Sequence, residues 1–213
     1  MKTGFFITIE GPDGAGKTSL LNNLMPALRD IFGDNLVETR EPGGVRISEA
    51  IRKIVLGIKY PEMNRRTEAL LFAAARAQHM VEKIEPALTE GKIVLSDRFV
   101  DSSIAYQGGG RGLGIKAVSE INKFATNGLR PNLTLLLDLP SEIGISRIMK
   151  HRVNEVNRLD KDRLIFHKKV RQTYLQLAKD QPNRIKVIDA TQSPEKIAIN
   201  ALQLIQESLK GWI

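Results

Sequence analysis

A glycine-rich segment, GPDGAGKTS at positions 11–19, follows an apolar run close to the start of the chain. The run at 5–9 has the composition of a buried β-strand, and a helical pattern begins near Lys17. The segment therefore fits the pattern G-x-x-x-x-G-K-T between a strand and a helix, where backbone N–H groups surround phosphate oxygens. The alternative is a glycine-rich turn that matches by chance, and the flanking elements favour a nucleoside triphosphate site.

The residue types of this loop suit the binding of phosphates and a metal ion. Glycine lets the backbone curl so that successive N–H groups converge on one anion. Lys17 is expected to lie against the β- and γ-phosphates, and Thr18 to offer its hydroxyl to Mg²⁺, which keeps much of its water in such sites. The residues expected to bind the nucleoside triphosphate here are Gly11, Pro12, Asp13, Gly14, Ala15, Gly16, Lys17 and Thr18.

The composition bounds the class of protein. A length of 213 residues with 42% hydrophobic residues is enough for one sizeable core, and no linker or repeat divides it. No run approaches the roughly 20 apolar residues that cross a bilayer, and the first apolar run is too short for a signal peptide. With no cysteine, disulfides and thiolate metal sites are excluded, so we expect a cytoplasmic protein with no membrane partner.

The net charge of +8 comes from 32 basic residues interleaved with 24 acidic ones. The sequence shows neither a basic tail nor the aromatic and basic platform of a nucleic-acid binder. We therefore expect no nucleic acid polymer as a partner, and we attribute the basic balance to a pocket for polyphosphates.

Apolar β-type runs alternate with helical patterns along the whole chain. The β-type runs lie at 5–10, 36–40, 93–97, 133–139 and 185–190. The helical patterns lie at 17–31, 65–90, 115–127, 141–150, 162–179 and 194–209. Near-continuous apolar strands are typical of sheets buried on both faces. The sequence therefore predicts an α/β fold of the P-loop NTPase type, a three-layer sandwich in which helices flank a mainly parallel five-stranded sheet. A single P-loop domain would span 1–213.

Polar residues follow several of these strands, at the sheet edge where ligands gather in such folds. Arg40 opens the turn REPGG, which lets its guanidinium face an anion, although taken alone the segment is an ordinary turn with an ion pair. Asp97 and Arg98 stand at the end of the run at 93–97. There Asp97 is placed to hold Mg²⁺ through water, and Arg98 to bind a phosphate.

The segment 102–107 is the next candidate for ligand recognition. If it is helical, Ser102 lies near Tyr106 and Ser103 near Gln107, because residues four apart share a face. Such a face offers hydroxyls and an amide, which can recognise a sugar and the edge of a base. The alternative is a capped helix with a surface tyrosine and glutamine.

Phe72 and Arg76 are also four apart, within the helical pattern at 65–90. An aromatic ring beside a guanidinium can stack on a base and donate to its carbonyl oxygen. The alternative places Phe72 in the core and Arg76 in solvent. His79 is expected to be structural, because no second His or Cys stands at ligand spacing.

Together these motifs resemble the bacterial type of thymidylate kinase, a family of P-loop nucleoside monophosphate kinases. The resemblance covers almost the full length of the chain. It rests on the phosphate loop with Asp13, REPGG at 40–44, LLFAAARAQH at 70–79, DRFVDSSIAYQG at 97–108 and PNLTLLLDLP at 131–140, in the family's order and spacing. The resemblance implies transfer of the γ-phosphoryl group of ATP to thymidine monophosphate (dTMP), with Mg²⁺, by a homodimer.

The resemblance also implies a role for each matching residue. Asp13 would contact the deoxyribose 3′-hydroxyl, and Tyr106 would lie where a 2′-hydroxyl would clash. Phe72 would stack on thymine, Arg76 and Gln107 would read its edge, and two arginines would bind the monophosphate. The implied substrate-binding set is Asp13, Arg40, Phe72, Arg76, Arg98, Ser102, Ser103, Tyr106 and Gln107, with Thr18 and Asp97 at the metal.

The polar stretch at 150–163 resembles the family's mobile lid. Arg152 and Arg158 within it are candidate catalytic residues, beside Lys17 and Arg98. Eukaryotic-type members carry an arginine after the loop aspartate where this chain has Gly14, so the missing cation would come from the lid. The stretch departs from the family's usual acids at 157 and 160, which leaves the choice between the two lid arginines open.

Arg147 and the loop 191–194 are candidates for the adenine pocket. Two other functions stay open at this point. One is a kinase of another nucleoside monophosphate on the same fold, and the other is a P-loop NTPase switch. The switch lacks its N-K-x-D guanine signature, to which Asn122-Lys123 is only a partial match.

Overall fold

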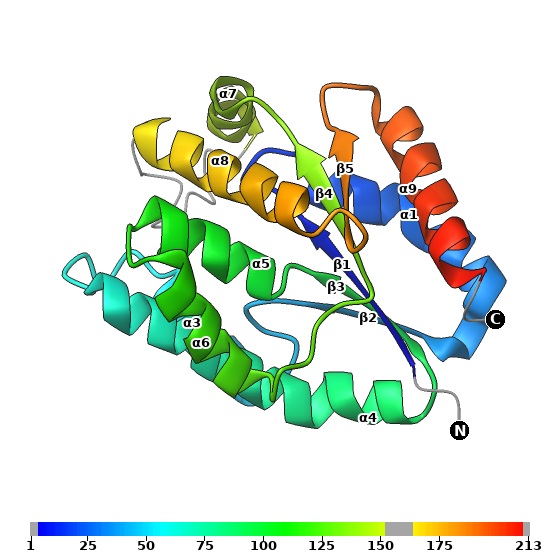
Figure 1. Cartoon of the computed structure of the whole chain (residues 1–213), viewed down its shortest axis with the longest axis horizontal. Helices are drawn as coiled ribbons and strands as arrows, with labels where there is room; N and C mark the ends of the chain where they lie inside the picture. The colour runs from blue at the N-terminus through cyan, green and yellow to red at the C-terminus, as the bar shows by residue number, and fades with distance from the viewer. Residues whose placement is uncertain (1–3, 152–163, 211–213) are drawn as a thin grey trace.

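The computed structural model describes residues 4–151 and 164–210, and its centre is a five-stranded sheet (Figure 1). All four strand pairs are parallel, in the order β2-β3-β1-β4-β5. The strands are β1 (Phe5–Glu10), β2 (Leu36–Arg40), β3 (Ile93–Asp97), β4 (Leu133–Asp138) and β5 (Ile185–Asp189). This order confirms the prediction of a five-stranded, mainly parallel sheet. The prediction rested on near-continuous apolar strands, which are typical of sheets covered on both faces.

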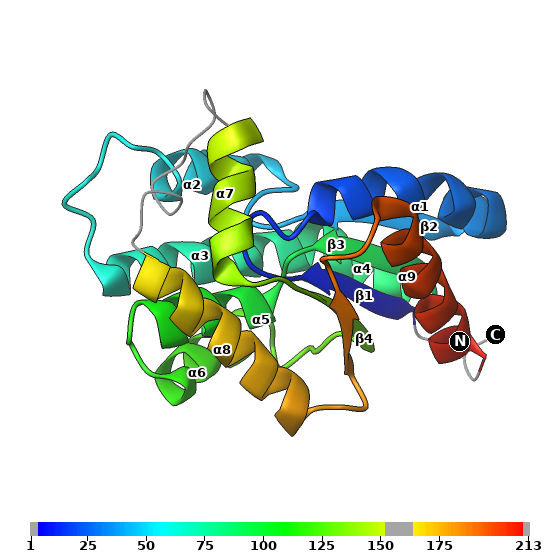
Figure 2. The same ribbon diagram turned by 90° about the horizontal axis from the view of Figure 1, so that it is seen from above.

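Helices cover both faces of the sheet and make the three layers (Figures 1 and 2). One layer contains α1 (Lys17–Phe32) and α9 (Pro194–Leu209), which pack together. On the opposite face lie α3 (Arg65–His79), η2 (Met80–Ile84), α4 (Glu85–Thr89), α5 (Val100–Ser103), η3 (Ile104–Gly110), α6 (Ile115–Ala125) and α8 (Leu164–Asp180). The remaining helices are η1 (Gly33–Asn35), α2 (Arg46–Val55) beside α3, and α7 (Ser141–His151).

Strand β1 shows how the apolar sequence fills both layers. Phe5, Ile7 and Ile9 belong to the core on the side of α1 and α9. Phe6 belongs to the opposite core and packs edge-on against Phe99, with ring centroids 4.8 Å apart. Side chains alternate between the two faces of a strand, so a strand that is apolar at successive positions contributes side chains to both cores.

Three helical features differ from the sequence prediction. Helix α2 was absent from the prediction, although Ile47, Ile51 and Ile54 recur at helical spacing within its ten residues. The pattern at 65–90 divides into α3, the π-helical η2 and α4. The segment after Ser103 is π-helical as η3 rather than α-helical, so the expected spacing of four residues does not apply within it.

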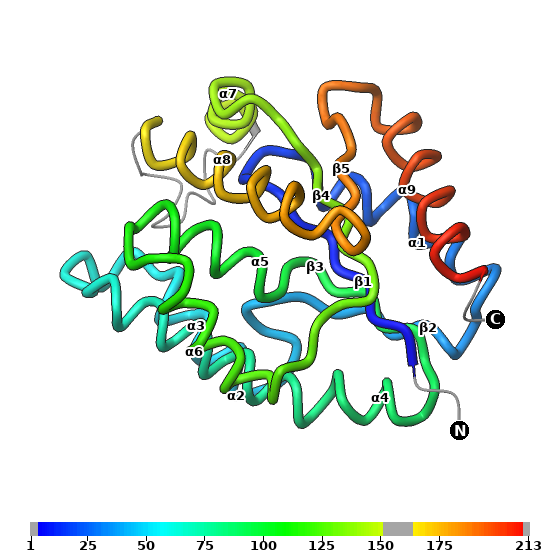
Figure 3. The backbone as a smooth tube through the Cα atoms, viewed as in Figure 1, coloured from blue at the N-terminus to red at the C-terminus, as the bar shows by residue number. Residues whose placement is uncertain are grey.

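The carboxyl ends of the strands meet along one edge of the sheet, where loops run into α1, α5 and α7 (Figure 3). None of the helices in the described ranges, 4–151 and 164–210, is long and apolar enough to cross a membrane. The parallel topology thus brings together loops that are far apart in the sequence, and it places them around one cavity.

Candidate active site

A cavity of about 1300 Å³ opens at the carboxyl ends of β1, β2 and β3. The predicted site residues that line it are Asp13, Gly14, Ala15, Gly16, Lys17, Thr18, Arg40, Phe72, Arg76, Asp97, Arg98, Ser102, Ser103, Tyr106, Gln107 and Arg147. Gly11 and Pro12 are not among the lining residues, and their carbonyl groups accept hydrogen bonds from Lys17 instead. Arg152, Arg158 and most of the expected lid at 150–163 lie outside the described residues.

The glycine-rich loop joins β1 to α1 and curls under α7. Gly14 has a φ of +78°, and a Cβ there would collide with the backbone of Gly144 in α7. A Cβ at Gly144 would in turn lie 2.7 Å from the carbonyl oxygen of Asp13. Two facing glycines therefore let α7 approach the phosphate loop, as Figure 2 shows from above.

Lys17 folds back over the loop at the start of α1. Its Nζ donates to the carbonyl oxygens of Gly11 and Pro12, at 3.0 Å each. Burial, together with the nearby charge of Arg98, lowers the pKa of Lys17 to about 8. An entering phosphate would offer this ammonium group the opposite charge and would favour its protonated form.

Arg98 links the ends of β1 and β3. Its backbone has a φ of +71°, in the left-handed region that non-glycine residues rarely adopt. Its guanidinium donates to Asp13 Oδ1 at 2.6 Å, while the Tyr106 hydroxyl donates to Asp13 Oδ2 at 2.7 Å. Burial and the charge of Asp13 raise the pKa of Tyr106, so its hydroxyl remains a donor. Sequence reasoning grouped these three residues, and the structure brings them together.

Glu10 was not among the predicted site residues. The last residue of β1, it is fully buried and accepts from the Phe99 amide at 2.7 Å and from the hydroxyls of Ser102 and Tyr174 at 2.6 and 2.8 Å. Burial and the nearby charge of Asp101 raise the pKa of Glu10 to about 7. Its available signal was an acid that ends an otherwise buried strand next to the phosphate loop.

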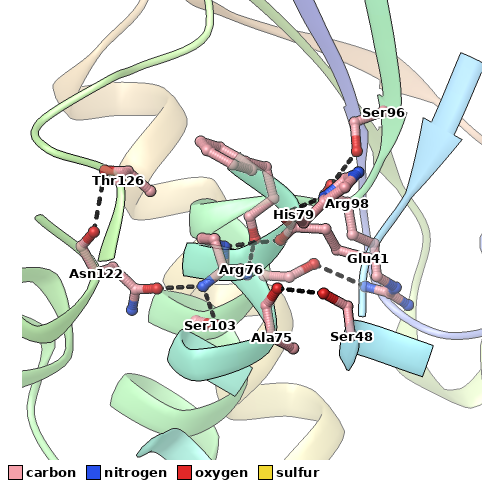
Figure 4. Close-up of polar contacts among 12 residues, drawn as sticks. Glu41, Ser48, Ala75, Arg76, His79, Ser96, Arg98, Ser103, Asn122 and Thr126 are labelled. Atoms are coloured by element: carbon pink, nitrogen blue, oxygen red, sulfur yellow. Dashed lines mark hydrogen bonds and ion pairs between the residues drawn. The ribbon is translucent and has the colours of Figure 1, made fainter. Parts of the chain in front are cut away.

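Arg76 is buried in the wall of the cavity, so the alternative of an arginine in solvent is wrong. Figure 4 shows its polar contacts. Its Nε donates to Glu41 Oε2 at 2.7 Å, and Nη2 donates to the carbonyl oxygen of Phe99 at 3.0 Å. Its Nη1 donates to the side chains of Ser103 and Asn122. Four donor groups thus fix the guanidinium plane before any ligand binds, and one N–H on Nη2 has no partner among the described residues.

Glu41 connects this arginine to a histidine that sequence analysis treated as structural. Its Oε1 lies 3.0 Å from His79 Nδ1, and His79 Nε2 lies 2.7 Å from the Thr39 hydroxyl. The histidine is completely buried and does not line the cavity. Phe72 and Gln107 do line it and are buried at 9% and 1% exposure, so a surface position for Gln107 is also wrong.

The turn after β2 carries one predicted cation and one that sequence reasoning missed. Arg40 is half-exposed and donates to Glu49 Oε1 at 2.8 Å. Arg52, from the unpredicted α2, lines the cavity and donates to the Pro42 carbonyl oxygen at 2.7 Å. Burial, and then the neighbouring charge of Arg40, lower the pKa of Arg52. Two cations therefore face the same part of the cavity, as an anionic ligand requires.

The residues expected to hold Mg²⁺ suit a cation that also binds phosphate and water. Asp97 Oδ1 is buried beside the cavity and has no hydrogen-bond partner within the described ranges. Thr18 lines the same cavity. No three His, Cys, Asp or Glu side chains in residues 4–151 and 164–210 form a metal cluster. The protein alone offers few ligands, which fits an ion that arrives with a nucleotide.

Arg147 stands at the far end of the cavity, on α7. Its Nη1 lies 3.4 Å from the carbonyl oxygens of Gly14 and Ala190, and Gln192 and Pro194 also line this end. Arg147 contacts the phosphate loop at Gly14, whereas Arg98 and Tyr106, which line the cavity together with Phe72 and Gln107, contact the loop at Asp13. The cavity therefore offers two chemically different ends on either side of the phosphate loop.

Comparisons with known proteins agree with this geometry. The family model described as "Thymidylate kinase" matches residues 9–200. The chain is 92% identical to a thymidylate kinase of Oenococcus oeni, with all of both chains aligned, and 57% identical to one of Latilactobacillus sakei, with 96% of each aligned. A crystal structure of thymidylate kinase from Ehrlichia chaffeensis superposes with a TM-score of 0.77 at 31% identity, covering 96% of this chain and 99% of that one. The chain belongs to the thymidylate kinase family.

Proposed function

We propose that the cavity binds ATP and dTMP together and transfers the γ-phosphoryl group of ATP to dTMP, giving dTDP and ADP. The observation that carries this function is the contact of Arg98 with the phosphate loop, because Lys17 and Arg98 there line one cavity. Kinases of other nucleoside monophosphates and P-loop switches are not favoured, because the close relatives are thymidylate kinases.

The chemistry asks the protein chiefly for alignment and positive charge. The acceptor phosphate is already an anionic nucleophile, so no side chain has to remove a proton from it. Lys17 and the loop amides would hold the triphosphate, and Arg40 and Arg98 the monophosphate. The Thr18 hydroxyl and, through water, Asp97 would hold Mg²⁺, which would supply positive charge against the phosphates.

The other end of the cavity would hold the nucleoside. Phe72 would stack on thymine, Gln107 and the remaining N–H of Arg76 would bind its edge, and Asp13 and Tyr106 would contact the deoxyribose. Ser102 and Ser103 would act through their neighbours, since their hydroxyls bond to Glu10 and Arg76. Arg147 would lie near the adenine of ATP.

An initial-rate assay with dTMP, dUMP, dCMP and dGMP as acceptors tests this function. ADP release is coupled to NADH oxidation, with ATP and Mg²⁺ in excess. We expect the highest kcat/KM with dTMP. A higher kcat/KM with dCMP or dGMP would contradict the proposed substrate, and ATP hydrolysis that no acceptor stimulates would contradict the kinase reaction.

We also propose that the enzyme is a homodimer that works in the cytoplasm. Support comes from apolar side chains exposed on helices that pack side by side: Ile54 on α2, Leu70 on α3 and Phe124 on α6, of which Phe124 is 92% exposed. Light scattering should give twice the chain mass at micromolar concentration, and F124S should shift the equilibrium toward the monomer. A wild-type protein that is monomeric under these conditions would exclude the dimer.

A further inference from the structure

Gln107 is hydrogen-bonded to the carboxylate of Glu68, a residue to which the sequence analysis gave no role. Its Nε2 donates to Oε1 of Glu68, at 2.8 Å, from the first turn of α3. Both side chains are buried, each with 1% of its surface exposed. Arg111 forms an ion pair with the same carboxylate, with its Nε 3.2 Å from Glu68 Oε1. A buried charged residue thus contacts the residue that is proposed to read the base.

The partner fixes which way the amide of Gln107 faces. An ionised carboxylate only accepts hydrogen bonds, so the NH₂ group of Gln107 must face Glu68 and its carbonyl oxygen must face away. The guanidinium of Arg111, which also stacks on the Phe166 ring at 4.6 Å, offsets the charge of this carboxylate. Gln107 lines the cavity, and no donor in the described ranges reaches its side-chain oxygen, Oε1.

We propose that Glu68 is a specificity-determining positioning residue, which makes Gln107 present an acceptor to the base and so selects bases with an N–H at N3. Thymine and uracil carry that donor, whereas cytosine has an unprotonated nitrogen there and would face the Gln107 oxygen with a lone pair. The inference rests on the proposed function, because it assumes that the base binds against Gln107.

The substitution E68Q tests the proposal, since an amide at 68 can accept or donate and no longer dictates the orientation of Gln107. The readout is the ratio of kcat/KM for dTMP to kcat/KM for dCMP, or the ratio of their inhibition constants where dCMP turns over too slowly. We expect this ratio to fall by roughly tenfold or more, because a mismatched buried hydrogen bond is lost as a source of discrimination. The ratio of dTMP to dUMP should not change, since both bases carry the N3 donor.

The double variant E68Q/Q107L distinguishes an effect of Glu68 that acts through Gln107 from a general effect of Glu68 on the structure. If Glu68 acts through Gln107, E68Q should change the ratio little once Gln107 is absent. An equal loss of kcat/KM for dTMP and dCMP in E68Q, or an unchanged ratio, would overturn the proposal. If E68Q does not fold, E68Q/R111M removes both charged partners, and the same fall in the ratio is expected. A wild-type enzyme without activity on dTMP would instead refute the proposed function.

Discussion

Burial of Lys17 disfavours its charged form, whereas its proposed role requires the positive charge. It is 8% exposed, and burial lowers its pKa to about 8, so the protein without nucleotide holds this charge at a cost. Its partners in the loop are two carbonyl oxygens rather than a carboxylate. Lys17 is therefore placed to gain most from an anion, which is the role that the loop motif predicts.

The variant K17M keeps the volume of the side chain and removes its charge. We expect kcat to fall by at least about a hundredfold, because a positive charge that stabilises the transition state typically supplies that much. The melting temperature without nucleotide should stay equal or rise, since a buried charge is removed. Activity near wild type would refute the role of Lys17. A large loss of melting temperature would mean that the residue mainly supports the fold.

Glu10 predicts a pH dependence of stability. Burial raises its pKa in the folded protein to about 7, above the ordinary value of 4.5, so the folded state binds more protons than the unfolded chain between these pH values. The free energy of unfolding therefore decreases as pH rises from about 4.5 to about 7. The difference between the two pKa values corresponds to roughly 3 kcal/mol from this group.

The variant E10Q lacks this titration and keeps the shape of the side chain. Its amide oxygen can still accept from the Phe99 amide, and its NH₂ group would donate to the hydroxyls of Ser102 and Tyr174, which can accept as well as donate. Urea unfolding of both proteins at pH 5 and pH 8 isolates the effect, because the other groups titrate in each. The loss of stability between these pH values should be smaller in E10Q. Equal losses in the two proteins would show that Glu10 has an ordinary pKa in the folded state.

At the level of helices and strands, the sequence predicted all five strands to within one residue, because most of them are compact apolar runs. It did not predict α2 or the π-helical segments. The period of a π-helix is close enough to that of an α-helix that apolar spacing does not distinguish them. These misses fall around the cavity, which is lined by Arg46 and Arg52 of α2 and by Tyr106 and Gln107 of η3.

The sequence named many of the residues that line the cavity, but not their buried partners. Loop motifs name Lys17 and Arg98 directly, whereas Glu10 reaches Tyr174 across 164 positions and Glu41 reaches Arg76 across 35. Such pairs depend on the tertiary fold, and spacing within one helix gives no sign of them. An isolated acid in a sequence is more often on the surface, so its burial has to be seen.

Gln107 lies in η3, where its side chain is hydrogen-bonded to α3 and lines the cavity, so Q107L tests its role in binding the base. This change should raise the KM for dTMP by roughly tenfold or more and leave the KM for ATP unchanged, because only the base loses a partner. R76A is a poorer test, since it also leaves the buried Glu41 carboxylate without its ion pair. Equal increases in both KM values for Q107L would place Gln107 outside the base site.

At the scale of the whole molecule, the difficulty of the reaction is electrostatic. The phosphates of two anionic nucleotides must meet end to end. The described part of the cavity supplies positive charge for them from Lys17, Arg40, Arg52 and Arg98. The phosphate loop itself supplies only Lys17, since Gly14 stands after Asp13. We therefore keep the proposal, made from the sequence, that residues 150–163 act as a lid that adds a further cation.

Arg152 and Arg158 are the residues in which that proposal can be tested. R152A or R158A should lower kcat by about a hundredfold or more with little change in the KM for dTMP, because a transition-state charge is lost. R66A, which removes an exposed arginine of α3 away from the cavity, is the matched control. Near-normal kcat in both single variants and in the double variant would place the missing cation outside this stretch.

The central claim is that one cavity holds both nucleotides with their phosphates in line. An inhibitor in which adenosine and thymidine are joined through their 5′-oxygens by five phosphates spans both ends and tests this most directly. Steady-state inhibition should be competitive with ATP and also competitive with dTMP, and binding should be tighter than for either nucleotide alone. Inhibition that is competitive with ATP but noncompetitive with dTMP would contradict the account, because the two nucleotides would then bind at separate sites.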